Sequence, residues 1–156
     1  MAAAQEMGAT AVKYPKPAHE YRAEGLAPSN LACGVRVGVI ARPDPDEAWR
    51  IANERFPEDR KGQFMRTVAT KLSDSAWHKE LAGMKTAGQS PYWLHPFENY
   101  QTNCPYLVGG YQQVAAELAG YIACGYQTYI LDIPPCEEEF EHIGVVFNAA
   151  CQSVTV

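Results

Sequence analysis

Arg36 is the residue whose position in the sequence most strongly indicates chemistry. It is the polar member of an otherwise apolar run, GVRVGVIA, which spans Gly34 to Ala41. A charge in an apolar strand must find a partner or an anionic ligand, because burying it alone costs free energy. Two interpretations stay open, namely contact with a cofactor or substrate and a structural pair with Asp132 from the last predicted strand.

Other candidates lie where predicted strands end. Lys13 and Tyr14 end a short β-prone run, and Arg42 and Asp132 end two longer ones. Lys13 and Tyr14 offer a cation and an aromatic face to a cofactor, or they are a solvated lysine and a packed tyrosine. Strand ends are the place where a barrel of parallel strands puts its chemistry.

Gly109 and Gly110 directly precede a predicted helix. The free backbone N–H groups of a helix start favour an anion, so these glycines are candidate cofactor-binding residues. The alternative is that glycine simply makes the turn. The sequence around them is not a phosphate-loop motif.

An aromatic segment lies between Gly83 and Pro105 and carries Tyr92, Trp93, Phe97 and Tyr100. A loop of this length is usually functional or mobile, and we expect it to be a lid that excludes water or a surface that packs on a partner subunit. His95, within it, is the histidine we would test for acid–base chemistry. No histidine has a neighbour at metal-ligand spacing, and we predict no metal site.

The composition excludes several classes of protein. The 156 residues carry a formal net charge of −5 without a basic cluster, so nucleic acid and anionic membranes are poor partners. No apolar run approaches the length of a membrane span. Five cysteines without a CxxC pair fit reduced thiols, and we expect a cytoplasmic protein.

Strands and helices alternate along the chain. We predict strands over Thr10 to Tyr14, Gly34 to Ala41 and Tyr126 to Ile133, and helices over Pro45 to Phe56, over Gln112 to Cys124 and from about Glu137. Phe64, Val68 and Leu72, four residues apart, predict one or two amphipathic helices in between, and Phe140, Ile143, Gly144 and Phe147 predict the buried stripe of the last helix. Such an order is typical of right-handed βαβ units in a parallel sheet or barrel.

Three sequence motifs carry a family resemblance. They are R-x-x-x-x-E-A-W from Arg42 to Trp49, L-V-G-x-x-x-x-V-A from Leu107 to Ala115, and G-Y-x-T-Y-I-L from Gly125 to Leu131. In this order they resemble the C-terminal part of a bacterial luciferase-like flavin monooxygenase, of the alkanesulfonate monooxygenase type.

The resemblance implies an α/β fold, the C-terminal part of a TIM-type (β/α)8 barrel. Residues 1–156 would form about three βα units, with the sixth, seventh and eighth strands, and 56–105 would be the insertion or lid. The first residues resemble the interior of a helix. Because a whole barrel takes about 250 residues, we expect the missing N-terminal half to come from a complementary chain or a homo-oligomer.

The resemblance also implies a reaction. Reduced FMN from a separate flavin reductase and O2 would insert one oxygen atom into a small organic substrate. Lys13, Tyr14, Arg36, Gly109 and Gly110 would bind the flavin, and Arg36 and Tyr100 would be catalytic.

Two positions depart from the family pattern. Gly38 stands where many sulfonate-type members carry a histidine, and Pro134 stands where they carry a tyrosine. Two alternatives therefore remain open: a non-catalytic structural partner subunit, and a deazaflavin-dependent oxidoreductase that transfers hydride.

Overall fold

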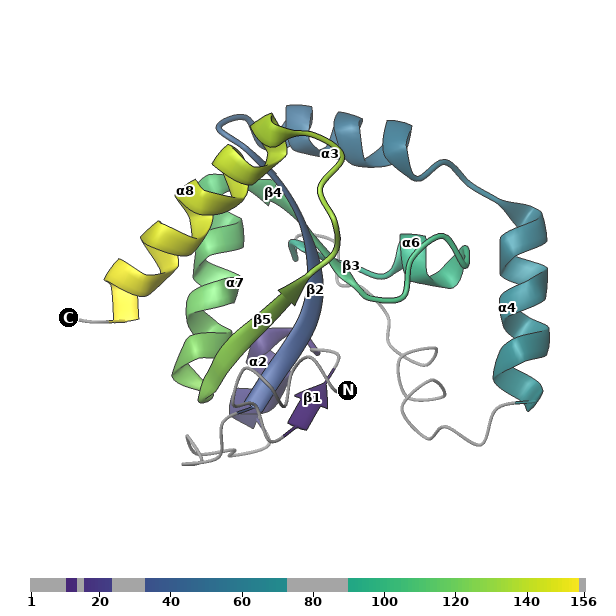
Figure 1. The fold of residues 1–156 in the computed structure, drawn as a ribbon, viewed down its shortest axis with the longest axis horizontal. Coiled ribbons are helices and arrows are strands. Elements are labelled where there is room, and N and C mark those ends of the chain that lie inside the picture. Colours follow the sequence, from purple (N-terminus) through teal and green to yellow (C-terminus); the bar gives the residue numbers. More distant parts are fainter. Residues whose placement is uncertain (1–10, 14–15, 24–32, 73–89, 155–156) are drawn as a thin grey trace.

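The computed structural model describes residues 11–13, 16–23, 33–72 and 90–154. These ranges form a five-stranded mixed sheet with helices packed around it (Figure 1). The elements in chain order are β1 (Ala11–Lys13), α2 (Ala18–Ala23), β2 (Cys33–Arg42), α3 (Pro45–Arg55), α4 (Arg60–Leu72), β3 (Tyr92–Trp93), α6 (His95–Glu98), β4 (Tyr106–Gly110), α7 (Tyr111–Ala123), β5 (Tyr126–Leu131) and α8 (Glu137–Val154).

Strand β2 is the centre of the sheet. Its first half pairs in parallel with both β1 and β5, which therefore lie on its opposite edges, and its second half pairs in parallel with β4. The three strands predicted from the sequence are thus neighbours in the order β1-β2-β5. This arrangement is α/β and is compatible with part of a barrel.

The segment before α7 contains two strands that we did not predict. Tyr106–Gly110 forms β4, all five residues of which are buried, and Tyr92–Trp93 forms β3, antiparallel to it. We interpreted 83–105 as a long loop because it has no clear period. Strands of two and five residues, one of them buried on both faces, give no alternation from which they could be recognised.

The predicted ends of α3 are confirmed to within one residue. The Asp44 carboxylate caps the helix by accepting a hydrogen bond of 3.0 Å from the Asp46 N–H, and Pro45 occupies the first turn. At the other end, the Phe56 N–H donates to the carbonyl of Ala52 at 2.9 Å. Phe56 therefore caps α3 and also packs beneath it.

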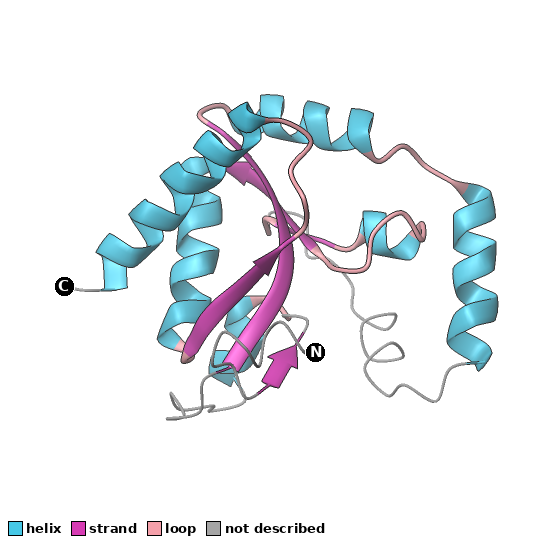
Figure 2. Ribbon diagram, viewed as in Figure 1, coloured by secondary structure: helices cyan, strands magenta, loops and turns pink. Residues whose placement is uncertain are grey.

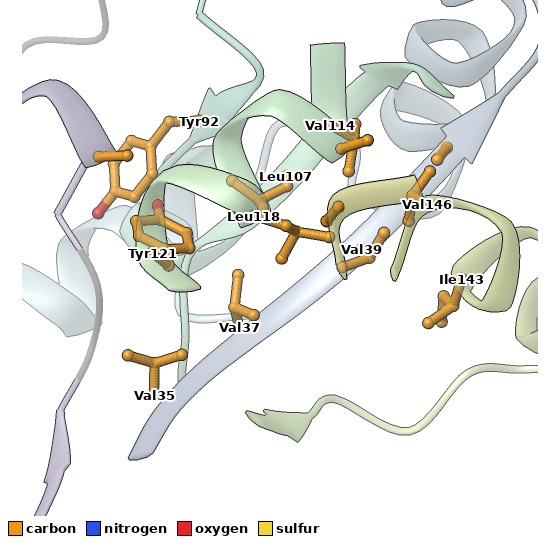
Figure 3. Close-up of a cluster of buried hydrophobic side chains, with 14 of the residues drawn as sticks. Val35, Val37, Val39, Tyr92, Leu107, Val114, Leu118, Tyr121, Ile143 and Val146 are labelled. Atoms are coloured by element: carbon orange, nitrogen blue, oxygen red, sulfur yellow. The ribbon is translucent and has the colours of Figure 1, made fainter. Parts of the chain in front are cut away.

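The main hydrophobic core lies on one face of β2, which α7 and α8 cover (Figures 2 and 3). Val35, Val37 and Val39 alternate along the strand, as side chains that share one face of a sheet must. Leu118 of α7 and Val146 of α8 pack against them, and both are fully buried. The helices that follow β4 and β5 thus hold the sheet from the same side.

A second, smaller cluster lies on the other face of β2. Ile40 packs there with Ala48 and Ala52 of α3 and with Tyr106 and Val108 of β4. Arg36 and Gly38 precede Ile40 at intervals of two residues, so their Cα–Cβ directions also face this side. Arg36 and Gly38 therefore lie on the face of the sheet opposite α7 and α8.

The buried stripe of α8 differs from the prediction. Glu139, Ile143, Val146 and Ala150 are its buried residues, whereas Phe140 is 55% exposed and Phe147 is partly buried. Glu139 replaces Phe140 in the interior because two arginines bind its carboxylate. An apolar periodicity could not anticipate a buried ion pair.

Tyr92 and Phe97 of the expected lid belong to the main core instead. Both are almost fully buried, and Trp93 beside them stacks on the His95 ring with ring centroids 5.3 Å apart. Within residues 90–105, the part of this segment that the structure describes, Tyr92 and Phe97 are therefore packed structure, whereas Tyr100 is exposed. Among the described helices, none is both long and apolar enough to cross a membrane.

Candidate functional site

A cluster of polar side chains surrounds Gly38 at the middle of β2. Gly38 lies level with Tyr106 at the start of β4, and Val37 lies level with Leu131 at the end of β5. Asp132 follows β5, and its N–H donates to the carbonyl of Val37 at 3.3 Å. The start of β4 and the end of β5 thus lie on either side of Gly38.

The Tyr106 side chain crosses β2 over Gly38. A Cβ atom added to Gly38 would lie 2.3–2.5 Å from three atoms of the Tyr106 ring, so glycine leaves the space for this crossing. The Tyr106 hydroxyl then donates a hydrogen bond of 2.7 Å to Oδ2 of Asp132. Burial and this hydrogen bond both raise the pKa of the Tyr106 phenol, which therefore stays protonated.

Arg36 joins the same cluster through Asp132. Its Nη2 atom lies 3.7 Å from Oδ1 of Asp132, and its side chain is 33% exposed. The predicted structural pair of Arg36 with Asp132 is therefore confirmed. The Nε atom of Arg36 is buried without a hydrogen-bond partner of good geometry among the described residues, and this leaves one donor of the guanidinium unused.

Cys104 is the fourth member of the cluster. Burial raises the pKa of its thiol to about 12, the Asp132 carboxylate adds to the rise, and the nearby Arg36 guanidinium opposes it. The sulfur is therefore a protonated thiol at neutral pH and a poor nucleophile. We name Arg36, Cys104, Tyr106 and Asp132 the Arg36 cluster.

A separate pocket of about 540 Å³ lies at the carboxyl ends of β2 and β4. It is lined by Pro43, Pro45, Gly110, Tyr111, Gln112 and Gln113. Arg36 and Arg42 are six residues apart on β2, so the backbone of Arg36 is about 20 Å from this end of the strand, and Tyr106, four residues before Gly110 on β4, is about 13 Å from it. The carboxyl ends of parallel strands are the usual place for a ligand site in α/β proteins.

Gly110 lines this pocket, and Gly109 directly precedes it in β4. Gly109 has a φ of 151°, a conformation that favours glycine, and Gly110 is the residue before the first turn of α7. The Gly110 N–H already donates to Oε1 of Gln113 at 3.1 Å. The turn interpretation of Gly109 and Gly110 is thus supported, and Gly110 also lines the pocket as a candidate binding residue.

Tyr111 connects the pocket to α8. Its hydroxyl lies 2.5 Å from Nδ1 of His142, and Nε2 of the same ring lies 3.7 Å from Oε1 of Glu138. Sequence analysis missed this arrangement because Tyr111 and His142 are 31 residues apart and share no motif. These contacts link the pocket wall to the first turn of α8.

Arg42, a strand-end candidate, is a structural residue. It is buried and binds Glu139 of α8 through both guanidinium nitrogens, and Nη2 of Arg55 lies 3.3 Å from the same carboxylate. Burial alone would raise the pKa of Glu139, but the hydrogen bond and charge of Arg42 outweigh it and lower the pKa. Arg42 therefore fixes α8 to β2.

Lys13, Tyr14 and Tyr100 are the remaining predicted site residues, and the structure describes two of them. Lys13 ends β1 and lies level with Val35, whereas Tyr14 lies outside the described residues. Tyr100 is exposed, with a φ of 59°, after α6. Across the part of the chain that the structure describes, no hydrogen bond or ion pair joins Tyr100 to Arg36, so the two expected catalytic residues are not brought together by a direct contact.

Comparison with known proteins gives one relative and no match to a family model. The relative is the 4-(gamma-L-glutamylamino)butanoyl-(BtrI acyl-carrier protein) monooxygenase BtrO of Niallia circulans, which is 31% identical over 141 residues. This chain is similar to a monooxygenase. The match covers 86% of this chain and 41% of BtrO, so the chain spans about two fifths of its relative's length.

Proposed function

We propose that this chain is the C-terminal part of a flavin-dependent monooxygenase with a luciferase-like barrel. The observation that carries the proposal is the similarity to the monooxygenase BtrO over 86% of the chain. The proposed reaction inserts one oxygen atom of O2 into an acyl group held as a thioester on an acyl-carrier protein. The carrier-bound substrate is taken from the relative, because the substrate of BtrO is an acyl group on such a protein.

The arrangement of β1, β2 and β5 supports the barrel. Consecutive strands of a (β/α)8 barrel pair in parallel with their neighbours, and these three strands do so in the expected order. The helices that follow β4 and β5 pack on the same face of the sheet. The rest of the barrel corresponds to the part of BtrO outside the match, and the proposed activity requires it.

The Arg36 cluster offers a flavin one charged hydrogen-bond donor. The Arg36 side chain is 33% exposed, and its guanidinium suits a carbonyl oxygen of an isoalloxazine ring. Asp132 orients the guanidinium from the other side, and Tyr106 holds Asp132 in place. Reduced FMN, delivered by a separate reductase, supplies the electrons that activate O2 when it is bound.

A second function is favoured by the crossing over Gly38. Gly38 stands at the position where many members of the sulfonate-type family carry a histidine. The Tyr106 ring occupies the space that this side chain would need, so β2 has no room for it. A chain that lacks this group fits a non-catalytic partner subunit, which stabilises a catalytic chain and binds no flavin.

Flavin titration separates the two functions. The chain is purified alone and together with the product of the adjacent upstream reading frame, and FMN fluorescence is followed as protein is added. Saturable quenching by the complex supports the monooxygenase. If neither preparation quenches FMN fluorescence, the structural subunit is supported. If the fluorescence of a deazaflavin is quenched and that of FMN is not, hydride transfer is supported.

A matched pair of arginine variants locates the site. Arg36→Ala removes the proposed flavin donor and is expected to weaken FMN binding by at least tenfold. Arg50→Ala removes an exposed arginine that pairs with Glu54 on the same helix, at 2.8 Å, and is expected to leave binding unchanged. Equal affinities for the two variants would exclude Arg36 from the site.

A further inference from the structure

Among the described residues, helix α4 contacts the end of α6 through one narrow side. A Cβ atom on Gly62 would collide with the backbone carbonyl of Asn99, so the helix backbone lies directly against the end of α6. Next to it, Nε2 of Gln63 donates to Oδ1 of Asn99 at 2.8 Å. The attached side of α4 is therefore polar and carries a glycine.

The apolar side of α4 points away from this contact. Phe64, Met65 and Val68 are 69%, 57% and 38% exposed. At 100° per residue, Phe64 and Val68 lie about 100–160° around the helix from Gly62 and Gln63, whereas Met65 lies about 60° from Gly62. Figure 1 shows α4 at the edge of the molecule, on the side away from α7 and α8. The helix is amphipathic, as the sequence predicts, but its apolar stripe faces outward.

The charge of α4 is opposite to that of the whole chain. The helix RKGQFMRTVATKL contains four cationic residues and no acidic one, whereas the chain carries a net charge of −5. Lys61 and Lys71 stand three residues before and seven residues after Phe64, which places both positions along the apolar stripe. An apolar stripe between cations is complementary to an apolar and acidic surface.

The first turn of α4 adds to this preference. Arg60 and Lys61 are exposed and occupy the helix start. The Asp59 carboxylate caps this end by accepting a 2.9 Å hydrogen bond from the Lys61 N–H, and the first turn itself contains no acidic residue. Carboxylates of a partner placed beside this turn would pair with the two cationic side chains.

We propose that α4 is the docking surface for the acidic carrier protein that delivers the substrate. This inference rests on the proposed function, which needs a carrier-bound acyl group. The partner inserts apolar side chains against Phe64, Met65 and Val68 and sets its carboxylates against Arg60 and Lys61. The net negative charge of the rest of the chain repels an acidic partner and so directs it to this cationic helix.

The test measures binding of the phosphopantetheine-bearing BtrI acyl-carrier protein to the full-length protein by fluorescence anisotropy. Phe64→Ser is expected to weaken binding at least tenfold, and Lys61→Glu is expected to weaken it and to reduce its salt dependence. Phe140→Ser is the matched control, because Phe140 is a similarly exposed phenylalanine on α8. Both phenylalanine variants should keep the thermal midpoint of the parent, since both side chains are exposed.

Four results overturn the docking proposal. The first is the absence of saturable binding of the BtrI carrier, and the second is equal weakening of that binding by Phe64→Ser and Phe140→Ser. The third is binding of the protein to anionic phosphatidylserine vesicles that Phe64→Ser abolishes while carrier binding persists. The fourth is conversion of a dimer to a monomer by Phe64→Ser without effect on carrier binding. Carrier binding requires no flavin and no turnover. Loss of the proposed oxygenase activity with carrier binding intact would therefore count against the proposed function alone.

Discussion

The Tyr106 hydroxyl reaches across β2 to donate a 2.7 Å hydrogen bond to the Asp132 carboxylate. This bond joins the start of β4 to the residue after β5, two segments that do not pair with each other in the sheet. Asp132 is also the partner of Arg36, so the position of the Arg36 guanidinium depends on Tyr106. The proposed flavin donor is thereby fixed by a residue from a different strand.

Tyr106→Phe tests this dependence. The variant keeps the ring over Gly38 but removes the donor to a charged acceptor, a bond of the kind that contributes about 1.5–3 kcal/mol. We expect the free energy of unfolding from urea titration to fall by about that amount. Tyr100→Phe, which changes an exposed tyrosine, should leave it unchanged. Equal stability of the parent and Tyr106→Phe would mean that this bond does not hold the cluster.

Gly38→His tests the steric account of the departure from the family pattern. A side chain at this position must displace the Tyr106 ring, and overpacking of this kind typically costs about 1–3 kcal/mol or more. The thermal midpoint is expected to fall by several degrees. Gly144→Ala is the control, because a Cβ on Gly144 meets no atom within 4 Å and alanine favours a helix interior by up to about 1 kcal/mol. A stable Gly38→His variant would contradict the crossing.

The fold was predictable where one residue pattern determined one element. Asp44 and Pro45 marked the start of α3, and Gly125, with a φ of 90°, marked the end of α7. The near-continuous apolar run of β2 predicted a strand buried on both faces. These signals are local, so the sequence contained them in full.

Glu139→Ala tests the buried ion pair that the sequence did not reveal. The substitution leaves Arg42 buried without its partner, a change that typically costs about 3–5 kcal/mol. Glu54→Ala, which breaks the exposed pair with Arg50, should cost less than about 0.5 kcal/mol. The two values come from urea unfolding at pH 7. Similar losses would show that Glu139 does not anchor α8.

The same carboxylate predicts a dependence of stability on pH. The pKa of Glu139 is lowered in the folded protein, so its contribution is fully present above its ordinary pKa of 4.5 and is lost as pH falls below that value. The parent should therefore lose stability between pH 5 and pH 3 more steeply than Glu139→Gln. Urea unfolding across this range measures both slopes, and parallel slopes would contradict the lowered pKa.

Thiol modification tests the burial of the Arg36 cluster. The Cys104 thiol, with a pKa of about 12 and no exposure, is expected to resist iodoacetamide at pH 8, whereas exposed Cys136 reacts. Peptide mass spectrometry reads the two sites separately, and Cys104 should be modified only in urea. Equal modification of both cysteines in the native protein would show that the cluster is open to solvent.

The site was less predictable than the fold because its contacts join distant segments. Arg36 and its pair with Asp132 were foreseen, since a lone charge in an apolar strand requires a partner. Tyr106 was not, because its role depends on the space above Gly38 and on a strand of five residues. The outward apolar side of α4 was not foreseen either, since periodicity predicts a stripe without saying which side the protein covers.

Oxygen labelling tests the central claim most directly. The chain, with the product of the adjacent upstream reading frame, is supplied with reduced FMN, ¹⁸O2 and an acyl thioester on the BtrI carrier protein, and the acyl group is analysed by mass spectrometry. The account predicts a mass gain from one ¹⁸O atom that depends on FMN and that Arg36→Ala reduces at least tenfold. An unlabelled acyl group from a preparation that binds FMN and carrier protein would contradict it.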